Sequence, residues 1–272
     1  MIKGKSPYPF ETIGLGISFT PALPFLIAEM KRICQIYDAL AVFIHVGKKT
    51  SEKQRELAQM LGDYGFHDGN SRIHWEQGDA VTGILLNCKM EVVDLLLIGS
   101  NEKASLGIPI GSTASQVAKK AKCSVLIYSR IPQGGFKKII LNGTEHQKTD
   151  LTILTGMYVT DKESAEDVTV IADEGNNKLS EAISHSHGET QSGTILFQQS
   201  IEKARAKMKF VNLENKQSIS EFSFRNNADL VVTRSSDHAL LIFDRISGSD
   251  GIDSLLTGLP ANLLIVHSRL SD

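Results

Sequence analysis

Short hydrophobic runs alternate with amphipathic stretches along the first half of the chain. Five segments have the length and pattern of a strand: 12–17, 39–46, 72–76, 94–98 and 123–128. The run at 39–46, ALAVFIHV, is apolar throughout, which is typical of a parallel strand covered on both faces. The stretches between the runs carry apolar residues at helical spacing, as they do after Pro21. This alternation predicts a doubly wound parallel α/β sheet.

The same order of elements restarts after RIPQGG at 130–135, whose proline and glycines break both helices and strands. Strands are predicted at 138–141, 167–172, 210–213, 229–233 and 262–267, and helices at 151–159, 194–208 and 218–226. We expect 173–193 to form a long loop or a partly helical segment. The repeat predicts an internal duplication, with two tandem five-stranded parallel-sheet domains at 1–133 and 134–272.

The composition is that of an ordinary globular protein. The chain has 272 residues, and its formal charge of −2 gives no basic surface for nucleic acid. No apolar run approaches the roughly 20 residues of a membrane-spanning helix, and the polar, proline-containing start is unlike a signal peptide. Cys34, Cys88 and Cys123 lie in segments that are predicted to be buried, which indicates reduced core cysteines. Together these features predict a cytoplasmic protein without membrane insertion.

The segment 94–128 carries the clearest candidate chemistry. It is predicted as a buried strand, a glycine-containing loop, a helix and a second buried strand, and Gly111, Ser112 and Thr113 stand where the helix begins. The first N–H groups of a helix have no partner inside the helix, and the helix dipole is positive at this end. This arrangement predicts an anion-binding site. No glycine stands where the loop after the corresponding strand at 229–233 begins, and no Gly-Ser pair precedes a full-length helix there, so we expect the second half to lack such a site.

Several local sequences of the first half resemble the universal stress protein family, in the family's order and spacing. They are IHV at 44–46, EQGD at 76–79, DLLLIGS at 94–100, GS at 111–112 and CSVLI at 123–127. The second half shares only the topology and the hydrophobic strands. The resemblance implies a tandem universal stress protein with two Rossmann-like domains. It also implies that the domains pair about a pseudo-twofold axis within one chain, and it leaves a homodimer open.

Nucleotide-binding members of that family carry the motif Gly-x2-Gly-x9-Gly-Ser/Thr. Gly99, Gly111 and Ser112 match it, whereas Glu102 replaces the second glycine and only eight residues separate it from Gly111. The family also places an aspartate after the first strand, where this chain has Ser18. The resemblance therefore implies a partly altered site for ATP or AMP, with the candidate residues Ser18, His45, Val46, Gly99, Glu102, Gly111, Ser112 and Thr113. The alternative is that the glycines and Ser112 are retained for the turn and the helix cap.

Other conspicuous residues favour ordinary structural roles. His45 ends an apolar strand and is expected as a satisfied histidine at the sheet edge, and Trp75 is expected to fill the core. His185 and His187 lack a third fixed ligand for a transition metal, so no metal site is predicted. The residues at 235–238 include serine, aspartate and histidine, but adjacent residues do not have the geometry of a catalytic triad.

Three functions compete. The first is a stress-response regulatory protein that binds an adenine nucleotide in the first domain. The second is a module of the same fold that binds no nucleotide and acts on a partner, such as a transporter. The third is an enzyme, such as a weak ATPase or a phosphotransferase. It ranks last because no residue is placed as a general base, a nucleophile or a metal ligand, and no catalytic residue is predicted.

Overall fold

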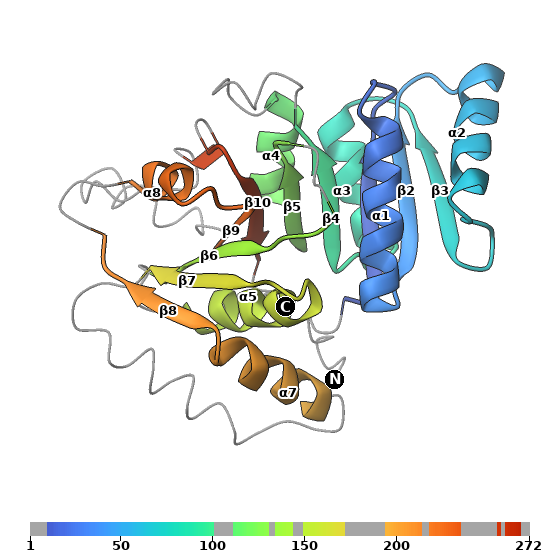
Figure 1. The fold of residues 1–272 in the computed structure, drawn as a ribbon. Helices are drawn as coiled ribbons and strands as arrows, with labels where there is room; N and C mark the ends of the chain where they lie inside the picture. The colour runs from blue at the N-terminus through green and yellow to red at the C-terminus, as the bar shows by residue number, and fades with distance from the viewer. Residues whose placement is uncertain are drawn as a thin grey trace, which may run out of the picture. The chain divides into compact units, whose positions relative to one another are not determined.

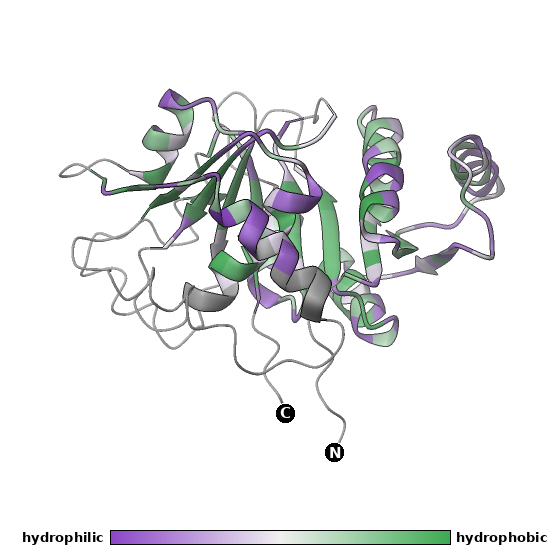
Figure 2. Cartoon of the chain, turned by 60° about the horizontal axis from the view of Figure 1, so that its bottom comes forward, coloured by the Kyte–Doolittle hydropathy of each residue, from purple (hydrophilic) through white to green (hydrophobic). Residues whose placement is uncertain are grey.

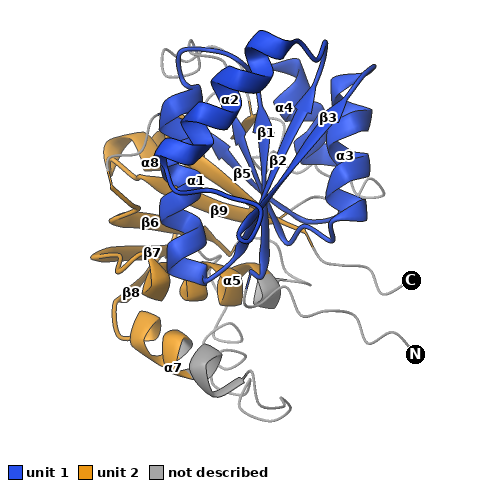
Figure 3. Cartoon of the chain, turned by 90° about the vertical axis from the view of Figure 1, so that its right-hand side faces the viewer, with its two compact units in different colours: residues 1–102, 110–131, 269–272 blue, residues 103–109, 132–268 orange. Residues whose placement is uncertain are grey.

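The structure, a computed structural model, describes residues 10–100, 111–130, 134–143, 149–171, 194–213, 218–234, 255–256 and 259–267. These residues form two compact units, one drawn from 10–130 and the other from 134–267 (Figure 3). Each unit combines a parallel sheet with helices, so the predicted α/β fold is confirmed in both.

The described part of the first unit holds five strands: β1 (Thr12–Ile17), β2 (Leu40–Val46), β3 (Ser71–Glu76), β4 (Leu95–Gly99) and β5 (Ser124–Tyr128). They are parallel, in the order β3-β2-β1-β4-β5. The direction of winding reverses between β1 and β4, the kind of point at which open α/β sheets bind ligands. Each strand begins within one residue of its sequence prediction, because the apolar runs have sharp polar boundaries.

The helices described in this unit are α1 (Leu23–Tyr37), α2 (Ser51–Asp63), α3 (Ala80–Met90) and α4 (Ser112–Lys120). Figure 3 shows α1 and α2 on one face of the sheet and α3 and α4 on the other. Local chemistry sets two of their starts. The side chains of Thr50 and Asp79 accept hydrogen bonds from the N–H groups of Lys53 and Thr82, at 3.2 and 2.8 Å. The strands β1, β2, β4 and β5 are hydrophobic, and the helices carry polar residues on their outer sides (Figure 2). The core therefore lies between the helices and the sheet.

The second unit repeats this arrangement. Its described strands are β6 (Lys138–Asn142), β7 (Asp167–Ile171), β8 (Met208–Val211), β9 (Leu230–Arg234) and β10 (Asn262–Val266). They are parallel in the order β8-β7-β6-β9-β10, which corresponds strand for strand to the first unit. Its longer described helices are α5 (Thr149–Lys162), α7 (Thr194–Arg205) and α8 (Ile219–Arg225) (Figure 1). The duplication predicted from the order of elements is therefore present in the topology.

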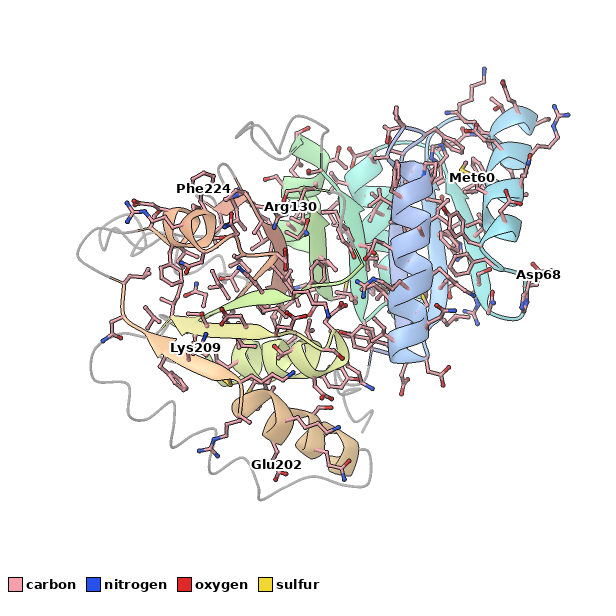
Figure 4. All side chains as sticks on the ribbon, in the orientation of Figure 1. Met60, Asp68, Arg130, Glu202, Lys209 and Phe224 are labelled. Atoms are coloured by element: carbon pink, nitrogen blue, oxygen red, sulfur yellow. The ribbon has the colours of Figure 1, made fainter. Side chains whose placement is uncertain are left out.

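Two sequence predictions in the second unit are wrong by a few residues. The helix predicted at 194–208 ends at Arg205, and β8 begins two residues before the strand predicted at 210–213. The register with β7 explains the shift, because pairing starts at the first residue of β8. Lys209 supports this register through an ion pair with Asp167 of β7, with 3.0 Å between Nζ and Oδ1 (Figure 4).

The glycines of the segment 130–135, where the sequence predicts the boundary between the two halves, adopt backbone conformations that favour glycine. Gly134 and Gly135 have φ angles of +79° and +110°, which residues with a Cβ rarely adopt. The segment 173–193, predicted as a loop or partly helical, lies outside the described residues. Among the described helices, none combines the length and the hydrophobicity needed to span a bilayer.

Candidate functional site at the carboxyl edge of the first sheet

The strands of the first unit bring most of the predicted site residues to one edge of the sheet. Ser18 follows β1, His45 and Val46 end β2, and Gly99 ends β4. Because the strands are parallel, these carboxyl ends lie at the same edge, where such sheets bind ligands. Helix α4 starts at this edge too, since it leads from the end of β4 to the start of β5. Glu102 lies outside the described residues.

Helix α4 begins without a side-chain cap. Its N-cap residue is Gly111, with φ −51° and ψ 146°. Ser112 and Thr113 are the first helical residues and are exposed, so the alternative in which the Ser112 side chain caps the helix is wrong. The N–H groups of these two residues donate to no described residue. The positive end of the helix dipole therefore keeps donors available for an anion.

Gly99 has a packing reason to be glycine. A Cβ at this position would lie 2.8 Å from Cδ1 of Leu26 on α1, closer than two side-chain carbons pack. Leu26 thus occupies the space beside the end of β4. A side chain at position 99 would displace the end of the Leu26 side chain, so packing favours glycine here whether or not a ligand is present.

Val46 makes a second close contact of this kind. A Cβ on Gly83 of α3 would lie 2.7 Å from Cγ2 of Val46. The next residue, Gly47, donates its N–H to the carbonyl oxygen of Glu76 at 2.8 Å, which extends the pairing of β2 with β3. Val46 therefore packs α3 against the end of β2.

Three rings meet at the ends of β1, β2 and β3, and we call Phe19, His45 and Trp75 the aromatic cluster. The His45 ring lies 5.0 Å from each of the other two rings, at 83° to Phe19 and 72° to Trp75. Phe19 and Trp75 stack at 6.2 Å and 25°. Trp75 is half-buried at the edge, so the expectation that it fills the core is wrong. The sequence reasoning also missed Phe19, although its place directly after the first strand could have signalled this edge.

His45 is buried, with 5% of its surface exposed, yet only one of its ring nitrogens has a partner. Nδ1 lies 3.2 Å from the carbonyl oxygen of Ile17, and this acceptor assigns the proton to Nδ1. Nε2 is buried and has no hydrogen-bond partner. Burial lowers the pKa of His45 below 6.5; the Ile17 contact opposes this shift, and the charge of Lys53 adds to it. Neutral His45 therefore presents a buried lone pair, and the expectation of a satisfied histidine holds only at Nδ1.

Two ammonium groups flank the aromatic cluster. Lys53 Nζ lies 5.1 Å from the centre of the Phe19 ring, and Lys49 Nζ lies 5.9 Å from the centre of the Trp75 ring. Within the part of the chain that the structure describes, neither lysine forms an ion pair. The edge thus combines aromatic faces, positive charge and a buried hydrogen-bond acceptor.

The remaining candidates within the described ranges add no second site. Cys34, Cys88 and Cys123 are free and buried, as expected. The described residues contain no group of three His, Cys, Asp or Glu side chains that could hold a metal ion. The candidates His185 and His187 and those at 235–238 lie outside the described residues.

Known proteins resemble this chain in sequence over one segment and in fold over nearly its whole length. Residues 37–129 match the model of the universal stress protein family. A putative universal stress protein from Pseudomonas aeruginosa superposes with a TM-score of 0.67 at 14% identity, over 97% of this chain and 96% of that one. A universal stress protein from Archaeoglobus fulgidus does so with a TM-score of 0.68 at 13% identity, over 97% and 100%. No curated protein matches the chain.

The matched segment 37–129 starts at the last residue of α1 and reaches the residue after β5. It includes His45, Trp75 and the whole of α4. The structural matches, at 13–14% identity, show a shared fold over nearly the whole chain. Residues 37–129 therefore belong to the universal stress protein family, and the chain as a whole shares the fold of the universal stress proteins it matches.

Proposed function

We propose that this chain is a stress-response regulatory protein that binds an adenine nucleotide, ATP or AMP, in its first unit. The observation that carries the proposal is the uncapped start of α4, where the N–H groups of Ser112 and Thr113 meet no described acceptor. Gly111 has no side chain to obstruct a phosphate there. These donors lie at the carboxyl edge of the sheet, on which the aromatic cluster also lies.

The sheet order sets the distance between the two ends of the proposed site. The end of β2 lies two strands from the end of β4, which is roughly 10 Å across the sheet. In the proposed arrangement the base lies near the aromatic cluster and the phosphates near α4. Ser18, between them at the end of β1, offers an exposed hydroxyl to the ribose. Glu102 adds a negative charge to the loop before α4, so we expect weak binding.

One observation favours a second function, an interaction module that binds no nucleotide. Packing against Leu26 accounts for Gly99, and packing against Gly83 accounts for Val46. Two of the residues that match the family motifs are therefore explained without a ligand. Such a module would act on a partner through its surface. In either case we propose that the chain acts by binding rather than by catalysis.

Calorimetric titration with AMP and ATP separates the two functions, together with analysis of any nucleotide released on denaturation. Nucleotide binding predicts measurable heat, and Gly111→Val should abolish it because a branched side chain obstructs the start of α4. Gln116→Val, an exposed change one turn further along α4, is the matched control and should leave binding unchanged. Glu102→Gly should strengthen binding. No heat and no released nucleotide would reject the nucleotide function and leave the interaction module.

We further propose that the chain works in the cytoplasm. The free, buried state of the three cysteines supports a reducing compartment.

We also propose that the chain divides into two functional domains, 1–133 and 134–272. The order of strands in the second unit, which repeats that of the first, supports the division. Expression of 1–133 alone tests it, since an independent domain should fold cooperatively and keep the nucleotide affinity of the full chain.

A further inference from the structure

Phe19 is the least anchored member of the aromatic cluster. It lies between β1 and α1, in a three-residue turn closed by a hydrogen bond of 2.8 Å from the N–H of Thr20 to the carbonyl oxygen of Ser18. Its half-buried ring is held by the contacts with His45 and Trp75 and by the ammonium group nearby. A change of its χ1 rotamer would remove the ring from the cluster without breaking a backbone hydrogen bond of the sheet.

The surroundings of Phe19 include a polar atom that lacks a partner. Nε2 of His45 is buried without a donor, whereas native proteins satisfy the large majority of such atoms. Because Nδ1 donates to Ile17, Nε2 can only accept, so its partner must offer an N–H or an O–H group. The rings of Phe19 and His45 form a T-shaped pair with 5.0 Å between their centres, so Phe19 is one of the groups that bury the imidazole.

The other groups around Phe19 define the chemistry of a partner. Trp75 presents a flat ring on which Phe19 is stacked, and a flat ring of a ligand could stack there in the same way. Lys49 and Lys53 lie over the two rings with no ion pair in the described part of the chain. A flat ring with an N–H donor could stack on Trp75 and bind Nε2 of His45, and the two ammonium groups would attract a ligand of negative charge to this edge.

We propose that Phe19 is a displaceable plug in the first unit. Its ring holds the place on Trp75 that the flat ring of a ligand takes when Phe19 swings out, and the ligand then donates a hydrogen bond to Nε2 of His45. This inference rests on the proposed function for the identity of the ligand tested, AMP. The plug lowers the affinity: a site closed in nine molecules of ten binds roughly tenfold more weakly than an open one.

Chemical modification tests the plug without any nucleotide. Diethyl pyrocarbonate reacts with an imidazole nitrogen that has an accessible lone pair, and peptide mass spectrometry follows the reaction at His45 in the folded protein. Phe19→Ala should raise this rate roughly tenfold. Phe25→Ala is the matched control, because Phe25 is 51% exposed on α1 and lies outside the aromatic cluster; it should leave the rate unchanged. Equal rates in Phe19→Ala and the unaltered protein, with both folded by circular dichroism, overturn the proposal.

Phe19→Leu covers the case in which Phe19→Ala does not fold. Leucine keeps an apolar side chain in the turn but cannot stack on Trp75, so it should give an intermediate rate of His45 modification. A rate equal to that of the unaltered protein overturns the proposal here as well.

AMP binding distinguishes the plug from the nucleotide function itself. The Phe19→Ala variant should bind AMP roughly tenfold more tightly than the unaltered protein. In this variant, bound AMP should change the fluorescence of Trp75, the single tryptophan, and protect His45 from modification. If AMP binds neither protein while Phe19→Ala still exposes His45, the nucleotide function fails and the plug stands. If AMP binds both proteins equally and His45 reacts equally in both, the plug fails and the nucleotide function stands.

Discussion

Asp94 in the first unit and Asp229 in the second make the same set of hydrogen bonds. Oδ2 of Asp94 accepts from the N–H groups of residues 11–12, and Oδ2 of Asp229 accepts from those of residues 137–138, all at 2.9 Å. The N–H of each aspartate also donates, at 2.8 Å, to the first residue of β1 or β6. Each aspartate directly precedes β4 or β9 and fastens the start of the neighbouring strand. The internal duplication thus extends from the order of strands to one carboxylate.

Removing these carboxylates should destabilise the two units to different extents. Asp94→Ala should lower the free energy of unfolding by about 1–3 kcal/mol, because it leaves the buried N–H of Thr12 without an acceptor. Asp229→Ala should cost less, since the N–H groups of Lys137 and Lys138 are exposed to water. Asp94→Asn keeps an oxygen and should cost less than Asp94→Ala. Urea unfolding followed by circular dichroism measures all three, and an Asp229→Ala as costly as Asp94→Ala would contradict this account.

Two helical glycines of the first unit should respond to alanine in opposite directions. At Gly83 the added Cβ would meet Val46 at 2.7 Å, so Gly83→Ala should destabilise the protein by about 1–3 kcal/mol. At Gly62 of α2 nothing lies within 4 Å of the added atom, so Gly62→Ala should stabilise it by up to about 1 kcal/mol. Thermal unfolding of the two variants side by side checks both signs. A neutral Gly83→Ala would show that α3 is not seated on β2 through this contact.

The titration of His45 should report on its burial. Because burial lowers the pKa of His45 below 6.5, the unfolded chain takes up a proton at this residue at a higher pH than the folded protein does. The contribution of His45 to stability is therefore complete above about pH 6.5, and it declines as the pH falls toward the folded-state pKa. An NMR titration of the imidazole C–H signals measures this pKa directly. Phe19→Ala should bring it closer to 6.5 by admitting water, and Phe25→Ala should not; equal values in both variants would speak against Phe19 as a cover.

The ammonium group of Lys53 should contribute to the binding of an anionic ligand. Lys53→Gln removes a positive charge beside the Phe19 ring and should weaken AMP binding several-fold at low ionic strength, and by less at high salt. Lys31→Gln is the matched control, because Lys31 lies 5.3 Å from the ring of Phe66, outside the aromatic cluster. Calorimetry at two salt concentrations measures both variants. Equal affinities for the two would remove Lys53 from the proposed site.

The sequence was sufficient for the strands and for part of the site. Apolar runs with polar ends set the strands of the first unit to within one residue, and the topology then carried Ser18, His45 and Gly99 to one edge. It was insufficient where pairing decides the register, as in β8, whose start depends on β7 rather than on its own apolar residues. It also misassigned Trp75, because hydrophobicity indicates burial without indicating whether a side chain reaches the core or the rim.

What the sequence by itself determined is the duplicated parallel fold, the family to which residues 37–129 belong and the glycine that opens α4. These properties depend on patterns among residues that are close in the sequence, so they can be read without the folded structure. Only the tertiary structure decided that Leu26 fills the space beside Gly99, that Phe19 stacks on Trp75, and that Nε2 of His45 is buried without a donor. Each of these facts depends on side chains from separate elements meeting at a set distance, and that distance is fixed only when the strands have paired and the helices have packed.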